Sequence, residues 1–281
     1  MRANVRGGGR RPGNFLSLDG SSEVLSQSYR IPSNVWSVAD KITRRIKRRQ
    51  KKQWAPKIEE GTVTRLYDID DLDFRGEWLV LTQANFMLNE TAERLRSRGY
   101  FYQRKGQNSL GKKVQGAIAS WEHLTSGPNK DVSLKEAENL YQHISSGSGI
   151  QRGAKKLLRT ANSEDTFSLE TLSKYFGLRA HGSWEEALDK IKDEDRAYVH
   201  ALLNRGVDLN AKPNITLSTI HGAKGGEAEN VLLYLDLTSK AIAQMGENPD
   251  DAYRVLYVGV TRTKQNLYLK MASQEDRGWI L

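Results

Sequence analysis

Apolar residues recur along this chain with two different periods, and the change of period divides the chain into segments. After Pro32, which suits a first helical turn, the spacing of Val35, Ala39 and Ile42 predicts a helix. The stretches EVLSQSY, GTVTRLYDI and GEWLVLTQ predict strands, and the third is continuously apolar, as in a buried parallel strand. NETAERLRSRG then predicts a helix that ends at Gly99, and YFYQRKG predicts a further strand.

From about residue 112 to 205 the pattern changes to successive helix-like segments, such as KVQGAIASWEHLT and DRAYVHALLNRG, with no clear strand. Strand-like patterns return in NITLSTIHG, NVLLYLD and NLYLKMA. We therefore predict an α/β fold with a parallel sheet, interrupted by an all-helical inserted subdomain. The predicted divisions are a flexible, basic, Gly-rich segment 1–20, a first α/β part 21–111, a helical insertion 112–205 and a second α/β part 206–281.

Composition limits the class of protein. The 281 residues are 38% hydrophobic, enough for one large or two smaller domains, and no apolar run approaches the ~20 residues of a membrane span. The basic N-terminus has no apolar stretch behind it, so it does not match a secretory signal. The absence of Cys is compatible with a reducing compartment, and we expect a cytoplasmic protein with no membrane partner. The five His residues are scattered, and the spacing indicates no metal site.

The formal net charge of +9 favours a polyanionic partner such as nucleic acid. The cations are densest between Arg44 and Lys52, at the end of the predicted helix. Two interpretations stay open for this basic run. It either contacts nucleic acid, or it is a solvated helix end whose cations suit the C-terminal end of the helix dipole.

Two Gly-rich stretches invite comparison with a phosphate-binding P-loop, G-x-x-x-x-G-K-[ST]. GAKGGEAEN does not fit, because its Lys precedes the glycines and no hydroxyl residue follows them. GQNSLGKK, residues 106–113, fits except at its last position, where Lys113 replaces the hydroxyl that would ligate Mg²⁺. We expect a turn there rather than a P-loop.

Three stretches in order resemble motifs of a known family. LSQSYRIPSNVWSVADKI resembles motif IV, TLSTIHGAKGGEAENVLL motif V and RVLYVGVTRTKQNLYL motif VI of superfamily 1 DNA helicases of the UvrD/Rep type. The resemblance covers nearly the whole chain, weakly in its helical part. VRGGGRRPG resembles the end of motif III, with Arg6 and Gly7 on its R-G pair. The earlier motifs of the first motor domain have no counterpart in this sequence.

The resemblance implies a RecA-like second motor domain, related to P-loop NTPases but without the P-loop, that closes over ATP held by a first motor domain. That first domain would also hold Mg²⁺. By resemblance, Arg30 of motif IV and Arg262 of motif VI are catalytic cations at the γ-phosphate, where arginine offers a permanent charge and a rigid fork of donors. Taken singly, each could equally be a surface or helix-capping Arg.

The resemblance also assigns nucleotide and DNA contacts. Tyr29 would stack on adenine, unless it is an ordinary core residue. Gly225 would bring its backbone close to the nucleotide, and Glu227 would accept a hydrogen bond from the ribose. Thr219 and His221 would face DNA phosphates, and Arg6 would contact DNA. The other interpretation of GAKGGE is a flexible strand-to-helix turn. The aromatic residues of the helical part are core residues or contacts to duplex DNA.

Two functions follow. In the first, the chain is the C-terminal motor half of an ATP-dependent 3′–5′ DNA helicase from a bacterium or a phage. It binds single-stranded and duplex DNA, works with a missing or separately encoded first motor domain, and is inactive alone. In the second, it is a free-standing, non-catalytic module that binds single-stranded DNA or a protein partner.

Overall fold

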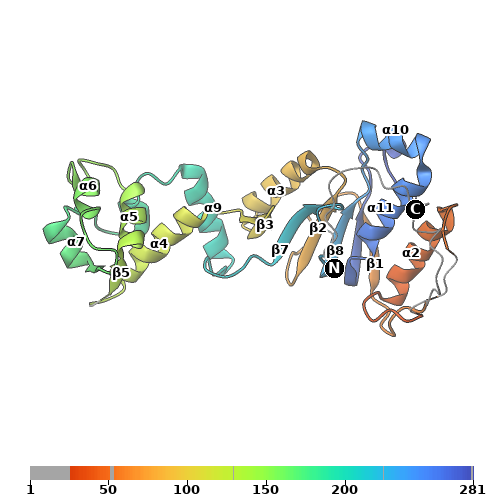
Figure 1. Ribbon diagram of the computed structural model, residues 1–281, viewed down its shortest axis with the longest axis horizontal. Coiled ribbons are helices and arrows are strands. Elements are labelled where there is room, and N and C mark those ends of the chain that lie inside the picture. The colour runs from red at the N-terminus through yellow and green to blue at the C-terminus, as the bar shows by residue number, and fades with distance from the viewer. Residues whose placement is uncertain (1–25, 51–53, 129, 224, 280) are drawn as a thin grey trace. The chain divides into compact units, whose positions relative to one another are not determined.

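The computed structural model describes residues 26–50, 54–128, 130–223, 225–279 and 281 (Figure 1). The chain forms two compact units that interleave in sequence. Unit 1 takes in the chain up to Ile69, Leu81–Gln83 and Thr219–Leu281, and unit 2 takes in Asp70–Val80 and Ala84–Ser218. The predicted boundaries at residues 112 and 205 both fall within unit 2 and stay a prediction.

Seven strands are hydrogen-bonded in the order β1-β9-β8-β2-β7-β3-β4. Their bounds are β1 Thr62–Leu66, β2 Trp78–Thr82, β3 Tyr102–Arg104, β4 Gln107–Asn108, β7 Ile215–Thr219, β8 Ala228–Tyr234 and β9 Thr263–Lys270. The pairs β1–β9, β8–β9 and β3–β7 are parallel, and β3–β4 is antiparallel. All five residues of β2 are buried, as its continuously apolar sequence predicts. The mostly parallel sheet confirms the α/β class.

Within the described residues, unit 1 carries three α-helices, α2 Ser33–Arg45, α10 Ser239–Glu247 and α11 Pro249–Val260, and the short 3-10 helix η2 Glu275–Arg277. α2 starts after Pro32 and buries Val35, Ala39 and Ile42, which confirms the predicted helix. The Asn248 side chain caps α11, whose first residue is a proline. The end of α2 meets the start of α11, where Arg45 lies over the Tyr253 ring, so these two packed helices are antiparallel.

Unit 2 holds the remaining helices. These are η1 Asn85–Met87, α3 Leu88–Ser97, α4 Lys112–Thr125, α5 Leu134–Gln142, α6 Ala154–Leu158, α7 Leu169–Tyr175, α8 Trp184–Ala187 and α9 Asp193–Asn204. α3 ends before Gly99, as predicted. One hydrophobic core unites α4 to α9, and Trp121, Tyr141 and Trp184 belong to it. Tyr175 lies outside that core with 61% of its surface exposed.

The region from 112 to 205 is not all-helical, and that part of the prediction was wrong. Asp131–Ser133 (β5) and Thr166–Ser168 (β6) pair as a two-stranded antiparallel sheet. Each strand runs directly into a helix whose N-cap is its last residue, Ser133 or Ser168. Three residues are too few for a two-residue alternation to be seen, so the sequence pattern shows only the helices that follow.

The stretch GQNSLGKK forms a turn rather than a phosphate loop. Lys105 and Gly106 both have positive φ, 52° and 74°, and join β3 to β4 as a tight hairpin. Gly106 therefore turns a hairpin instead of approaching a phosphate. Gly111 then caps α4, which begins at Lys112. The predicted turn is confirmed.

Some predictions fall wholly or partly on residues that the structure does not describe. Segment 1–20 and Arg6 lie outside the described residues, as does the start of EVLSQSY. Within the described part of that stretch, Gln27 forms an isolated bridge with Ala55 rather than a full strand. None of the helices in the described residues has the length and apolar character that crossing a membrane requires.

Two glycines with positive φ offer a matched test of packing in unit 2. A Cβ at Gly99, φ 67°, would lie 2.4 Å from the Ala201 carbonyl oxygen, whereas a Cβ at Gly106, φ 74°, meets nothing within 4 Å. We expect Gly106→Ala to cost about 1 kcal/mol through backbone strain alone. Gly99→Ala adds a steric clash and should cost about 3 kcal/mol in urea unfolding of the full chain. Equal losses for the two variants would contradict this packing.

Candidate functional site

An ion pair joins motif IV to motif V across 197 residues of sequence. Arg30 Nη1 lies 2.9 Å from Glu227 Oε2, and each side chain is 38% exposed. Arg30 stands just before α2 and Glu227 just before β8. Lys264, at the start of β9, brings its Nζ to 3.5 Å from the other oxygen of Glu227. A single carboxylate therefore faces two cations.

Arg262 of motif VI lies beside the same loop. Its Nε donates to the Val258 carbonyl at 3.1 Å, and its Nη1 donates to the Gly226 carbonyl at 3.3 Å. The Arg262 carbonyl in turn accepts a hydrogen bond from the Ala228 backbone N–H at 3.2 Å. These contacts hold the guanidinium against the loop that precedes β8, next to Glu227.

The cluster of Arg30, Glu227, Lys264 and Arg262 has more positive than negative charge. Burial lowers the pKa of Arg262, the neighbouring cation of Arg30 lowers it further, and Glu227 opposes this. The Nε of Arg30 is buried with no hydrogen-bond partner among the described residues. A buried donor and surplus cations are unfavourable unless an anion approaches, so these residues fit a phosphate group.

Other predicted nucleotide contacts lie in the same unit. Tyr29 is 88% exposed, which contradicts the alternative of a core residue and leaves its ring available to a ligand. Gly225 has φ 87°, and a Cβ there would meet nothing within 4 Å. The positive φ is therefore sufficient reason for a glycine at this position, without a nearby ligand. Glu227 faces Arg30 and Lys264 here, and its predicted ribose contact stays a prediction.

The two predicted DNA contacts of motif V differ in their surroundings. The Thr219 hydroxyl accepts a hydrogen bond from the Gly222 N–H at 3.0 Å and so stabilises the turn after β7. His221 is exposed and lines a cavity of about 340 Å³. The remaining residues around this cavity come from the segment after β2, from α10 and α11 with the residue between them, and from the C-terminal segment: Gln83, Ala241, Gln244, Glu247, Asn248, Asp251, Ala252, Val255 and Trp279.

Two residues of the cavity were missed at the sequence level. The Nε1 of Trp279 and the Oε1 of Gln83 are buried, and neither has a hydrogen-bond partner among the described residues. Trp279 is 4% exposed and packs on Tyr253, with ring centroids 6.1 Å apart. One donor and one acceptor beside an aromatic ring suit a flat polar molecule. Neither residue belongs to one of the three motifs, so no local signal marks it.

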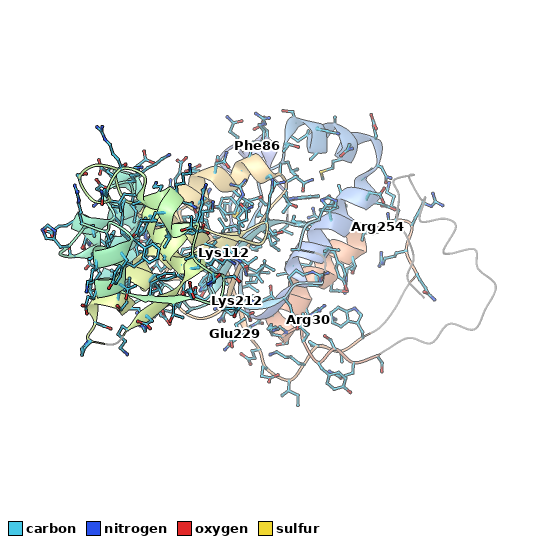
Figure 2. The ribbon with its side chains drawn as sticks, turned by 60° about the vertical axis from the view of Figure 1, so that its left-hand side comes forward. Arg30, Phe86, Lys112, Lys212, Glu229 and Arg254 are labelled. Carbon is cyan, nitrogen blue, oxygen red and sulfur yellow. The ribbon has the colours of Figure 1, made fainter. Side chains whose placement is uncertain are left out.

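α2 and α11 link the two sites. Arg30 lies at the end of this helix pair where α2 begins, and Arg254 lies toward the opposite end (Figure 2). Arg254 donates to Asp251 and to the Arg48 carbonyl, both at 2.6 Å, so it braces the helix start. Among the described residues, no three His, Asp or Glu side chains are grouped to hold a metal.

The profile of the UvrD-like helicase C-terminal domain matches residues 112–274, more than half of the chain. The chain belongs to this family. No curated protein matches the sequence. The match on the UvrD-like domain includes His221, Glu227 and Arg262, whereas Arg30 and Trp279 lie outside it. Family membership confirms the suspected resemblance and identifies a helicase C-terminal domain, a class that suggests nucleic-acid binding.

The ion pair between Arg30 and Glu227 should be visible in the titration of Glu227. The hydrogen bond from Arg30 lowers the pKa of Glu227, burial opposes this, and the charges of Arg30 and Lys264 reinforce it. The stabilisation is complete above the unfolded-state pKa, about 4.3, and is lost as the pH falls through the lower folded-state value. In a carboxyl-carbon NMR titration, Arg30→Ala should raise the pKa of Glu227 more than Lys264→Ala does. An unchanged pKa in Arg30→Ala would show that the pair does not form in solution.

Proposed function

We propose that this chain is the C-terminal motor half of an ATP-dependent 3′–5′ DNA helicase, with Arg30 and Arg262 as its arginine fingers. The observation that carries the proposal is the meeting of Arg30, Glu227 and Arg262, from three separate motifs, in one cluster with surplus positive charge. Composition and family membership support a nucleic-acid partner.

The chemistry follows from where the charge develops. Phosphoryl transfer places negative charge on the equatorial oxygens of the γ-phosphate, and fixed cations lower that barrier. Arg262 is held by two backbone carbonyls, so its guanidinium is already ordered before the reaction. Arg30 is held by Glu227 until a phosphate binds. When a phosphate draws Arg30 away, Glu227 is freed to accept a hydrogen bond from the ribose. Tyr29, exposed beside Arg30, would stack on the adenine.

A first motor domain would complete the site. The sequence contains no P-loop, and GQNSLGKK folds as a hairpin followed by a helix. The lysine that binds the β- and γ-phosphates and the Mg²⁺ ligands must therefore come from a protein or segment that carries the first RecA-like domain. Without it, we expect the chain to hydrolyse no ATP.

A second function is favoured by the cavity at His221. All its lining residues belong to unit 1, so a free-standing module could bind single-stranded nucleic acid through it. The two functions differ in whether a P-loop protein raises ATP hydrolysis when it is mixed with this chain. Nucleic-acid binding without any such stimulation would favour the module.

The arginine assignment has a direct kinetic test. In the assembled motor, Arg262→Ala should lower the rate of DNA-stimulated ATP hydrolysis about 10³-fold or more and leave DNA affinity unchanged. Arg262→Lys keeps the charge but loses the fork of donors, so it should recover little of that rate. Arg65→Ala, exposed on β1 and outside the cluster, is the control. Full activity of Arg262→Ala would disprove its role as an arginine finger.

Nucleic-acid binding in the cavity can be tested by removing one hydrogen-bond donor. Trp279→Phe keeps an aromatic ring but removes the unpaired N–H, which should weaken binding of a fluorescent dT oligonucleotide by about 1 kcal/mol, or roughly fivefold. Trp36→Phe is a matched control, because the Nε1 of Trp36 is also buried without a described partner and Trp36 does not line the cavity. Equal effects of the two variants on anisotropy titrations would argue against base recognition in the cavity.

A further inference from the structure

The basic run from Arg44 to Lys52 contains cations of two kinds. Three have partners within the protein: Arg44 pairs with Asp40 at 2.7 Å, Arg45 lies 5.6 Å over the Tyr253 ring, and Arg49 donates to the Ile46 carbonyl at 3.0 Å. Lys47 and Arg48 are exposed, and their side chains form no ion pair with any described residue. Lys51 and Lys52 lie outside the described residues.

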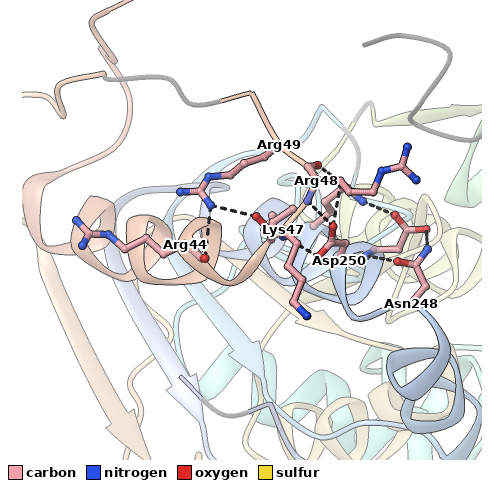
Figure 3. A network of polar contacts seen from close by, with 9 residues as sticks. Arg44, Lys47, Arg48, Arg49, Asn248 and Asp250 are labelled. Atoms are coloured by element: carbon pink, nitrogen blue, oxygen red, sulfur yellow. Dashed lines mark hydrogen bonds and ion pairs between the residues drawn. The ribbon is translucent and has the colours of Figure 1, made fainter. Parts of the chain in front are cut away.

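A buried carboxylate fixes the backbone of this turn. Asp250, whose side chain is 11% exposed, accepts hydrogen bonds from the N–H groups of Lys47 and Arg48, both at 2.8 Å (Figure 3). Burial would raise the pKa of Asp250, but these two N–H groups and the charges of Arg254 and Lys47 lower it below its ordinary value. Arg254 also donates to the Arg48 carbonyl at 2.6 Å. The turn is therefore held in one shape while its two unpaired cations stay in solvent.

The turn adjoins the cavity that Trp279 lines. Asn248 and Asp251, which flank Asp250, are both cavity residues. On the other side, the Arg45 guanidinium, the Tyr253 ring and the Trp279 ring follow one another at 5.6 and 6.1 Å. The basic turn and the cavity are thus neighbouring parts of one surface of unit 1.

The charged side chains favour different groups of a ligand at the cavity and at the basic turn. Glu247 and Asp251 line the cavity, and Asp251 already pairs with Arg254 at 2.6 Å. Glu247 forms no ion pair with a described residue, so a phosphate inside the cavity would meet its negative charge, whereas an uncharged ring would not. A phosphate attached to that ring would be attracted to cations outside the cavity. Lys47 and Arg48 are the neighbouring cations whose side chains form no ion pair with a carboxylate of the described residues, although the charge of Lys47 acts on nearby Asp250.

We propose that Lys47 and Arg48 bind backbone phosphates of a single-stranded nucleic acid whose base enters the cavity, and that Asp250 holds these two cations in place. Binding sites for single strands usually combine an aromatic side chain that contacts a base with cations that follow the phosphate backbone. The inference rests on the proposed nucleic-acid binding of the cavity. It gives the basic run a ligand of its own instead of a role as a solvated helix end.

The test measures the salt dependence of binding with the full chain and fluorescein-labelled (dT)12. Each phosphate contact on a single strand contributes about 0.7 to the slope of log K against log salt concentration. Lys47→Ala/Arg48→Ala should therefore flatten the slope by about 1.4 and weaken binding on the order of 10-fold at 0.1 M salt. The control Arg65→Ala/Lys212→Ala removes the same charge from exposed positions outside the turn and the cavity. A slope change equal in the two double variants would overturn the proposal.

For Asp250, net charge and the proposed support of the turn predict opposite changes in affinity. Asp250→Asn makes the chain more positive, so long-range electrostatics alone predicts tighter binding of (dT)12. If the carboxylate holds the turn, binding should weaken instead. Tighter binding would overturn the role given to Asp250.

Two binding results distinguish the phosphate contact at the basic turn from nucleic-acid binding as a whole. A wild-type chain that does not bind (dT)12 contradicts nucleic-acid binding altogether, and this inference with it. A chain that binds and is weakened by Trp279→Phe, but in which the Lys47→Ala/Arg48→Ala variant behaves as the control does, contradicts only the phosphate contact at the basic turn.

Discussion

The antiparallel packing of α2 on α11 decides where the charged groups of unit 1 lie. At one end, Asp250 at the start of α11 holds the backbone after α2. At the other end, Arg30 before α2 and Arg262 after α11 reach the loop that contains Glu227. A shift of either helix would separate both sets of contacts together, because each helix contributes to both ends.

Two acidic side chains near these helices are already occupied by cations or backbone N–H groups. Glu227 faces Arg30 and Lys264, and Asp250 accepts two N–H groups. The positive charges outnumber these acids, so part of the cationic surface has no counterion within the described protein. Such a surface is unfavourable in isolation and becomes favourable when phosphate groups bind. The same excess of charge thus supports both a nucleotide and a nucleic-acid ligand.

The loop between β7 and β8 spans the two candidate sites. His221 lines the cavity, and Glu227, six positions later, pairs with Arg30. A ligand that draws Arg30 from Glu227 acts on the same short loop that forms part of the cavity wall. In the proposed motor, this shared loop would couple the nucleotide to the nucleic acid.

Local sequence patterns are enough to predict most elements of the sheet and the family to which the chain belongs. Apolar periodicity predicted α2, the buried strand β2 and the end of α3 at Gly99, because those patterns follow from local geometry and burial. Motifs V and VI indicated the UvrD-like domain that the family match confirms. Periodicity failed for β5 and β6, which are too short to show it. Only the tertiary structure decided that Glu227 faces Arg30, that Gln83 and Trp279 share a cavity, and that Asp250 holds the basic turn. These contacts join residues roughly 200 positions apart, and side-chain packing between helices fixes them, which no local pattern encodes.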